Sequence, residues 1–233
     1  MNNWIDSLLG LFSPHICKDC SRPGKTLCSR CTFDILQQKE HFCALCYSPT
    51  KTTFLCHKCK TKRSTPFLDI YSLGVRRSVL KRLVGDYKFN SEYQSAQIIA
   101  GLIHNHLNSI SSDTVITFIP TINNHIRQRG FDHMALVAKI FAKKRGLKVA
   151  NLLVRTDNVV QHKLNLKSRK KAPEKSIAIN KKIKHFPEKV LLIDDIWTTG
   201  STMLTAGRLL KEHKVKQLFA LAVIIQPSKD FKK

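Results

Sequence analysis

Apolar and polar residues follow two different periods in residues 63–233. Short apolar runs typical of buried strands occur at 67–75, 114–120, 147–155, 189–195 and 215–225. Between them, apolar residues recur at the spacing of one helix face in 76–89, 92–107, 131–146 and 201–213. This alternation predicts an α/β fold, a mostly parallel sheet with helices on both faces. In such folds, ligands bind at the carboxyl ends of the strands.

The stretch 156–188 shows neither period and is strongly basic. Between Lys163 and Lys184 its only acid is Glu174. The whole chain has 40 Lys and Arg against 16 Asp and Glu, a formal net charge of +24. Such a surplus indicates a polyanionic partner, with nucleic acid first and an anionic membrane surface second. A basic surface or loop without a specific partner remains the alternative. The candidate DNA-binding residues are Lys163, Lys167, Arg169, Lys170, Lys171 and Lys175.

Nothing in the sequence predicts export or membrane insertion. The first residues lack a basic region and include Asp6, unlike a signal peptide. The most apolar stretch elsewhere, FALAVII at 219–225, is too short to span a bilayer. We therefore expect a cytoplasmic protein, whose cysteines lie in a reducing compartment.

All eight cysteines lie in an internal repeat. The segments 16–31 and 42–59 each contain two C-x-x-C pairs, with a proline three residues after the first pair. Four thiolates complete a tetrahedral, structural Zn²⁺ site, so each repeat is expected to bind one ion. Crossed pairing between the repeats and disulfide or redox chemistry are the alternatives. We predict a double zinc ribbon over 1–62 and the α/β domain over 63–233. The predicted ligands are Cys17, Cys20, Cys28 and Cys31 for one zinc, and Cys43, Cys46, Cys56 and Cys59 for the other.

The stretch VLLIDDIWTTGST, residues 190–202, carries the clearest binding chemistry. Asp194 and Asp195 end an apolar run, and a loop of small hydroxyl residues around Gly200 leads into a helix. A helix N-terminus favours a phosphate, whereas adjacent carboxylates accept hydrogen bonds from vicinal hydroxyls. A ribose 5-phosphate satisfies both. The candidate residues are Asp194, Asp195, Thr198, Thr199, Gly200, Ser201 and Thr202.

This stretch resembles the phosphoribosyl pyrophosphate (PRPP) signature of type I phosphoribosyltransferases. Together with the cysteine repeat, YKF at 87–89, RQRGFDH at 127–133 and the spacing of Arg155, Gln161 and Arg169, it resembles the ComF/GntX family. The resemblance implies a type I phosphoribosyltransferase-like domain, with Mg²⁺ arriving on the pyrophosphate of PRPP. It also implies a role in natural competence, with incoming single-stranded DNA and other competence proteins as partners.

The chain departs from the family pattern at two places. Asp132 and His133 stand where the family usually has Asn and Gln, and the proline-rich loop after the first core strand keeps one proline. The candidate pyrophosphate contacts are Pro120, Thr121, Arg127 and Arg129.

The sequence assigns no catalytic base. The loop position that is acidic in many 6-oxopurine enzymes is Thr198, and His133 and His162 are the only conceivable bases. A PRPP-binding module that holds DNA is therefore preferred over an active transferase with an unidentified acceptor. A protein-docking role of the zinc ribbons is a third interpretation.

Overall fold

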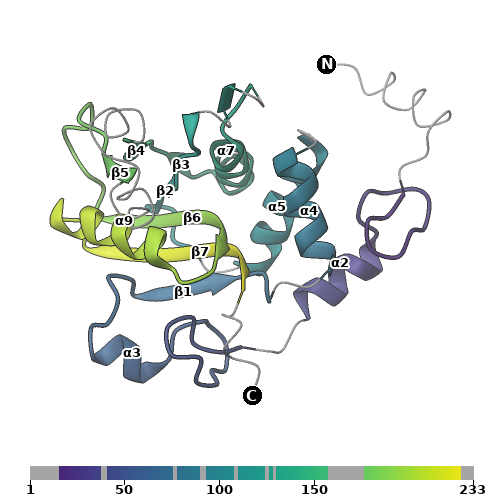
Figure 1. The fold of residues 1–233 in the computed structure, drawn as a ribbon, viewed down its shortest axis with the longest axis horizontal. Helices are drawn as coiled ribbons and strands as arrows, with labels where there is room; N and C mark the ends of the chain where they lie inside the picture. The colour runs from purple at the N-terminus through teal and green to yellow at the C-terminus, as the bar shows by residue number, and fades with distance from the viewer. Residues whose placement is uncertain are drawn as a thin grey trace, which may run out of the picture.

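A computed structural model describes residues 16–37, 41–75, 78–89, 93–107, 110–123, 126–127, 130–156 and 176–226. Its main sheet is parallel, with strand order β1-β7-β6-β2-β3 (Figure 1). The strands are β1 (Asp69–Ser72), β2 (Val115–Phe118), β3 (Lys148–Val149), β6 (Lys189–Trp197) and β7 (Gln217–Ile225). The predicted parallel sheet is confirmed.

Helices cover both faces of this sheet, as predicted. One face carries α4 (Ser78–Phe89), α5 (Tyr93–His106) and α7 (His133–Arg145), and the other carries α9 (Ser201–Glu212) (Figure 1). Because successive strand residues point to opposite faces, Leu191 and Ile193 enter the core beneath the first group, while Val190 and Leu192 pack towards α9.

Strand β6 runs further than its neighbour β2. The last β2 pair is Phe118 with Ile193, whereas β6 stays paired with β7 as far as Trp197. Asp194 and Asp195 therefore lie beyond the end of β2, where the chain after β2 turns away from the sheet. This step leaves the carboxyl end of β6 without a β2 partner on that side.

The segment 147–155 differs from the prediction of one strand. It contains β3 in the main sheet and β4 (Leu153–Arg155), which pairs antiparallel with β5 (Ile177–Ile179) in a separate two-stranded sheet. Between β3 and β4, the Leu152 N–H donates to the Thr117 hydroxyl at 3.4 Å, so the backbone at this point no longer pairs as a strand of the main sheet.

The two cysteine repeats pack on different parts of the α/β fold. The first contains α2 (Ser29–Leu36) and lies beside α4 and α5, while the second contains α3 (His57–Thr61) and lies next to β1 (Figure 1). Ile35 joins the core under α5, and Phe54 joins the core on the α9 face. The predicted division at residue 62 stays a prediction, and each repeat shares its buried side chains with the sheet domain.

Among the described helices, none has both the length and the apolar composition needed to cross a bilayer.

Candidate functional site

The two adjacent carboxylates lie where β6 extends past the end of β2. Asp195 is buried, Asp194 is half-buried, and the Asp195 N–H donates to Asp194 Oδ1 at 2.8 Å. Backbone pairing with β7 holds this part of β6, with Asp194 opposite Ala222 and Ile196 opposite Ile224. The sheet therefore holds two oxygen-rich side chains in a fixed place at its carboxyl edge.

The hydroxyl loop follows directly and ends in the first turn of α9. Gly200, at the N-cap, has φ 75°, and its carbonyl accepts from the Leu204 N–H at 2.8 Å. The side chains of Thr198 and Thr199 are exposed, and the Ser201 N–H donates to the Thr199 hydroxyl at 3.3 Å. The N-cap residue Gly200 has no side chain to cap α9, so the positive end of the helix dipole lies next to these hydroxyls.

Trp197 supports this loop from below, a role that the sequence-based prediction lacked. Its side chain is only 1% exposed and packs edge-on against Phe67, with ring centroids 6.3 Å apart. A Cβ atom on Gly200 would lie 2.3 Å from Trp197 Cζ2. The loop thus needs glycine both for its left-handed backbone and for its close approach to the indole. A tryptophan directly before a run of small loop residues is the sequence signal for this contact.

A buried chain of polar side chains joins Asp195 to the loop after β2. His133 Nε2 lies 2.7 Å from Asp195 Oδ2, and His133 Nδ1 lies 2.6 Å from the Thr121 hydroxyl. That hydroxyl donates to Asp132 Oδ1 at 3.0 Å. His133, Thr121 and Asp195 are each at least 91% buried. Of the two residues that depart from the family pattern, His133 therefore contacts the predicted ribose site directly, and Asp132 is linked to it through Thr121.

Asp132 also fixes the start of α7. Its side chain caps the helix by accepting from the Met134 and Ala135 N–H groups at 3.0 and 3.1 Å. Its other oxygen accepts from the Thr121 N–H at 2.8 Å. A single carboxylate thus positions both the helix that carries His133 and the loop that carries Thr121.

The candidate pyrophosphate residues are only partly brought together. Thr121 directs its N–H and hydroxyl to Asp132, and the Pro120 carbonyl accepts from Arg155 Nε at 2.8 Å. Arg127 is exposed. Arg129 lies outside the described residues. Arg155, which the sequence contributed only as part of a spacing pattern, anchors the loop after β2.

Thr121, His133 and Asp195 resemble a nucleophilic catalytic triad in their residue types, but they do not form one that a substrate could reach. The Thr121 hydroxyl is buried and already donates to Asp132, so no solvent-facing hydroxyl is activated by His133. The site is instead suited to accepting hydrogen bonds from hydroxyl groups at Asp194 and Asp195 and to holding an anion at the adjacent helix N-terminus.

The eight cysteines form two groups, one in each repeat. The four Sγ atoms of each group lie within 4.8 Å of one another, in the sets Cys17, Cys20, Cys28, Cys31 and Cys43, Cys46, Cys56, Cys59. A tetrahedral zinc with Zn–S bonds of about 2.3 Å places its sulfurs about 3.8 Å apart. The Sγ distances of 3.7 Å between Cys20 and Cys28 and of 3.5 Å between Cys46 and Cys56 fit this geometry. Each repeat brings its own four sulfurs together, which favours the predicted pairing within a repeat over crossed pairing.

The backbone repeats along with the sequence. Ser21 and Tyr47 occupy equivalent positions after the second cysteine of a pair, with φ of 60° and 61°. Their N–H groups donate to the carbonyls of Cys17 and Cys43 at 2.9 and 2.8 Å. Both turns curl the chain around the sulfur atoms, as a metal-binding knuckle requires.

The thiol pKa values also favour a bound cation. Burial acts to raise the pKa of Cys17, but hydrogen bonds from the backbone of Cys28, Cys20 and Asp19 outweigh it and lower the pKa to about 6. Burial likewise opposes the lowering at Cys46, where hydrogen bonds from Ser48 and neighbouring thiols bring the pKa to about 6. Burial raises the pKa of Cys31 and Cys59, and the adjacent thiols raise it further. Four crowded sulfurs ionise together only beside a cation, and Zn²⁺ suits such a donor set.

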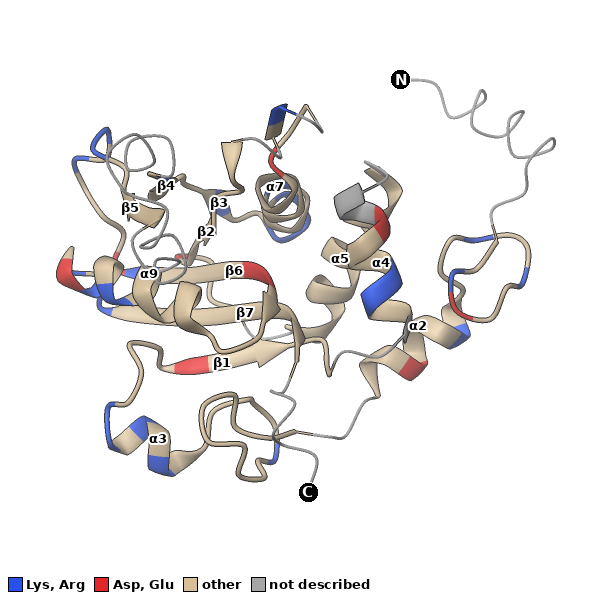
Figure 2. Ribbon diagram, viewed as in Figure 1, with Lys and Arg blue, Asp and Glu red and all other residues tan. Residues whose placement is uncertain are grey.

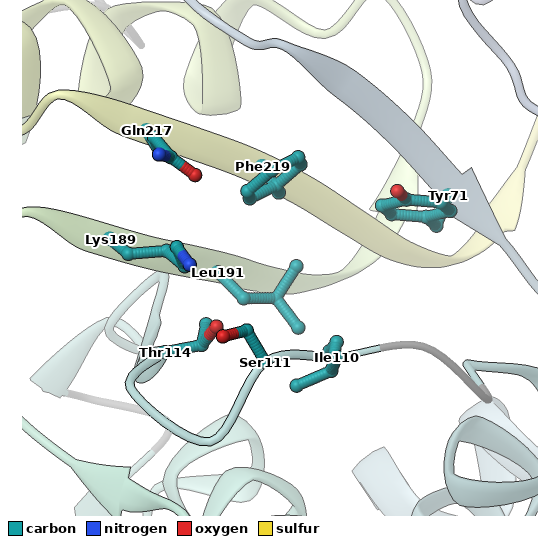
Figure 3. A pocket seen from close by; sticks show the side chains of 8 residues that line it. All are labelled: Tyr71, Ile110, Ser111, Thr114, Lys189, Leu191, Gln217 and Phe219. Carbon is teal, nitrogen blue, oxygen red and sulfur yellow. The ribbon is translucent and has the colours of Figure 1, made fainter.

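A small cavity lies at the opposite end of the sheet. It has a volume of about 90 Å³ and lies by the first residues of β6 and β7, Lys189 and Gln217, with Tyr71 and Phe219 in its wall (Figure 3). Burial, and then the charge of Asp69, raise the pKa of Tyr71. The ribose-site candidates lie at the carboxyl end of β6, so this cavity is separate from them.

The predicted DNA-binding residues Lys163, Lys167, Arg169, Lys170, Lys171 and Lys175 lie outside the described residues. Figure 2 shows Lys and Arg on several separate elements, including α3 and α7. An open groove of about 530 Å³ lies between α5 and α7. It is lined by Tyr93, Gln97, Ile140, Lys143 and Lys144, and Tyr93 is 54% exposed. An exposed aromatic ring thus lies beside two cations.

Comparison with known proteins agrees with this geometry. Residues 135–233, which include α7 from its third residue onward, β6 and the hydroxyl loop, match the model of the phosphoribosyl transferase domain. The chain is 25% identical over 199 residues to Competence protein ComFC of Bacillus subtilis (strain 168), covering 82% of this chain and 80% of that protein. It is 22% identical over 213 residues to Competence protein ComFC of Streptococcus pneumoniae (strain ATCC BAA-255 / R6), covering 90% of this chain and 87% of that protein.

These matches extend over most of the chain, and the two cysteine groups fit the zinc ribbons expected before the sheet domain. The chain thus carries a phosphoribosyl transferase domain and is similar over most of its length to ComFC proteins, which confirms its resemblance to the ComF/GntX family.

Proposed function

We propose that this protein is a ComF-like competence protein of the cytoplasm, whose phosphoribosyl transferase domain binds PRPP with Mg²⁺ while its basic surface holds single-stranded DNA. The observation that carries the PRPP part is the placement of two carboxylates at the carboxyl end of β6, directly before the uncapped N-terminus of α9. The placement of eight thiols in two zinc-like groups is consistent with a reducing compartment.

Each part of PRPP has chemically matched residues. Asp194 and Asp195 accept hydrogen bonds from the ribose hydroxyls, and the segment Thr198–Thr202 holds the 5-phosphate through hydroxyl and N–H groups. When it is bound, Mg²⁺ would neutralise negative charge on the pyrophosphate group of PRPP. The loop at Pro120 and Thr121, with Arg127 and Arg129, is the candidate for the pyrophosphate end.

Binding without turnover is the preferred activity. The described residues include no exposed acid or histidine next to the hydroxyl loop that would activate an acceptor. His133 is buried and held between two side chains, so it is poorly placed as a general base for an incoming nucleophile. An active transferase with an unidentified acceptor remains the alternative.

Calorimetry with PRPP and Mg²⁺ tests the site. The double variant Asp194→Asn, Asp195→Asn should lose PRPP binding, because it removes the carboxylates that accept from the ribose hydroxyls. It should keep the fold and its DNA affinity, because carboxylates contribute nothing to contacts with DNA phosphates. The matched control Asp113→Asn changes an exposed acid at the amino end of β2 and should bind PRPP normally. Unchanged PRPP affinity in the double variant would refute the assignment. Acceptor-dependent release of pyrophosphate from a panel of bases, nucleotides and single-stranded DNA would establish the transferase alternative.

The DNA part rests on charge and on the groove between α5 and α7. Lys143 and Lys144 suit backbone phosphates, and the exposed Tyr93 ring suits stacking with an unpaired base. The basic stretch that contains Lys163 to Lys175 supplies further candidate phosphate contacts. Phosphate contacts release counterions, so affinity should fall steeply with salt and depend little on sequence.

Binding of a fluorescent oligothymidylate over a range of salt concentrations tests this surface. The variant Lys143→Gln, Lys144→Gln should lower affinity and reduce the magnitude of the salt slope by about 1–2. Tyr93→Ala should weaken binding without changing the slope, because it removes stacking and no charge. The matched control Lys211→Gln, Lys214→Gln changes two exposed lysines at the end of α9. Equal losses in the control and the groove variant would show general charge attraction and no groove site.

A further inference from the structure

We propose that His133 is a positioning residue of the ribose site and that it acts as an imidazolium, which holds the Asp195 carboxylate and joins it to the loop after β2. The inference rests on the proposed function in one respect, the assignment of ribose to Asp195. The histidine link itself rests on the free protein, where its contacts are observed.

The contacts connect three separate segments. His133 lies in the first turn of α7, Asp195 lies in β6, and Thr121 lies in the loop after β2. His133 reaches Asp195 Oδ2 with one ring nitrogen at 2.7 Å and the Thr121 hydroxyl with the other at 2.6 Å. Both distances are those of short hydrogen bonds. A single ring therefore spans the distance between the carboxylate and the loop.

Counting hydrogens indicates the charge of this ring. The chain Asp132, Thr121, His133, Asp195 has three links, and its two ends are carboxylates. Asp132 also accepts three backbone N–H groups, from Thr121, Met134 and Ala135, which favour its ionised form. The Thr121 hydroxyl supplies one hydrogen, directed to Asp132. The two remaining links each hold a hydrogen only if both nitrogens of His133 are protonated, because a neutral imidazole carries one N–H.

The charged groups around His133 favour the same state. Asp195 faces it from β6, and Asp132 faces it through Thr121. On α5, the ionisable His104 and His106 are in the last turn, near the far end of α7, since Arg145 donates to the His104 carbonyl. The β3 cation Lys148 pairs with Val115 at the amino end of β2. A cation, Arg155, lies near the loop after β2, since it donates to the Pro120 carbonyl. The carboxylate in hydrogen-bond contact with the His133 ring is that of Asp195.

An imidazolium at this position has two effects on a ribose phosphate ligand. It fixes one oxygen of Asp195, so the carboxylate keeps one orientation before the ligand arrives. It also offsets one negative charge of the adjacent Asp194 and Asp195 pair, which otherwise repels the phosphates of PRPP. Because Asp132 holds both α7 and Thr121, a shift of the loop after β2 would be transmitted to Asp195 through the histidine.

Nuclear magnetic resonance of the free protein tests the charged state without any ligand. Long-range ¹H–¹⁵N spectra distinguish an imidazolium from either neutral tautomer, and His133→Gln identifies the signal. We expect both ring nitrogens of wild-type His133 to carry a hydrogen, and only one to do so in Asp195→Asn. A neutral His133 in the wild type, or no change in Asp195→Asn, would overturn the proposal.

PRPP calorimetry tests the effect on the ligand. His133→Gln keeps one N–H for Asp195 but no charge, whereas His133→Leu removes both. At about pH 6.5 we expect the Gln variant to bind PRPP about five- to tenfold more weakly than wild type, and the Leu variant to bind more weakly still. The ratio of the wild-type and Gln affinities should fall towards one at alkaline pH, and this ratio cancels the titration of PRPP itself.

The two measurements separate this inference from the proposed function. His213→Gln, at the exposed end of α9, is the control and should match wild type in both. PRPP binding with a ratio that does not change with pH would overturn the role of His133 and leave the proposed function intact. Failure of the wild type to bind PRPP would refute the proposed function, while the spectra would still decide the pairing of His133 with Asp195.

Discussion

Replacing Gly200 with alanine perturbs the loop between β6 and α9 in two ways. The residue has φ 75°, where an alanine is strained by about 1–2 kcal/mol. The new Cβ would lie 2.3 Å from Cζ2 and 2.4 Å from Cε2 of Trp197. Because the Trp197 side chain is 1% exposed and packed against Phe67, it has little room to move. Overpacking of this kind costs about 1–3 kcal/mol.

The two costs together predict a loss of about 3 kcal/mol in the free energy of unfolding, or a fall of about 6–12 °C in Tm. Two other glycines serve as matched controls. In Gly207→Ala the Cβ would lie 2.7 Å from Pro66 Cγ but the backbone is helical, so only a steric cost applies. In Gly101→Ala nothing lies within 4 Å of the Cβ in helix α5, so a gain of about 0.5–1 kcal/mol is expected.

Differential scanning calorimetry of the four proteins tests this order. Tm should decrease from Gly101→Ala to wild type, then to Gly207→Ala, and be lowest in Gly200→Ala. In a Trp197→Leu background the steric part of the Gly200→Ala loss should disappear, while the backbone part should remain. A Gly200→Ala protein as stable as wild type, or more stable than Gly207→Ala, would refute the described contact with Trp197.

Of three further predictions, two concern the zinc groups and one concerns the start of α7. Zinc should be lost progressively on acidification, because protons compete with the ion for the ligand thiolates, including those of Cys17 and Cys46, whose metal-free pKa values are about 6. A chelator-dye assay at each pH measures the release, and a metal content that does not fall even in strong acid would contradict the ligand assignment. Circular dichroism on chelation should then show loss of the repeats with retention of the sheet signal, and Tm should fall, since Ile35 and Phe54 belong to cores shared with the sheet. Asp132→Ala should lower the free energy of unfolding by about 2–3 kcal/mol, since it removes the cap of α7 and the acceptor of the Thr121 N–H. Urea unfolding measures this loss, with Asp34→Ala, which changes an exposed acid, as the control. Equal stability of the two variants would contradict the capping role of Asp132.

The sequence determined features that depend on neighbours along the chain. The alternation of apolar periods predicted the parallel sheet with helices on both faces, and the repeated C-x-x-C pairs predicted two four-sulfur groups. Asp194, Asp195 and the hydroxyl loop are contiguous, so their place at the end of a strand and the start of a helix could be predicted from local pattern alone. The division of 147–155 into two strands could not, because both halves have the same strand-like composition and only the pairing partners differ.

The tertiary structure decided the contacts between residues far apart in the chain. His133 and Asp195 are 62 positions apart, and no local pattern indicates that they share a hydrogen bond. Arg155 reaches Pro120 across 35 positions, and the two cysteine repeats, alike in sequence, pack against different parts of the sheet domain. Local pattern fixes which backbone element a segment forms, because that depends on side-chain period and turn chemistry. The partner of a buried polar group depends on which elements the core brings together, so it is known only once the chain is folded.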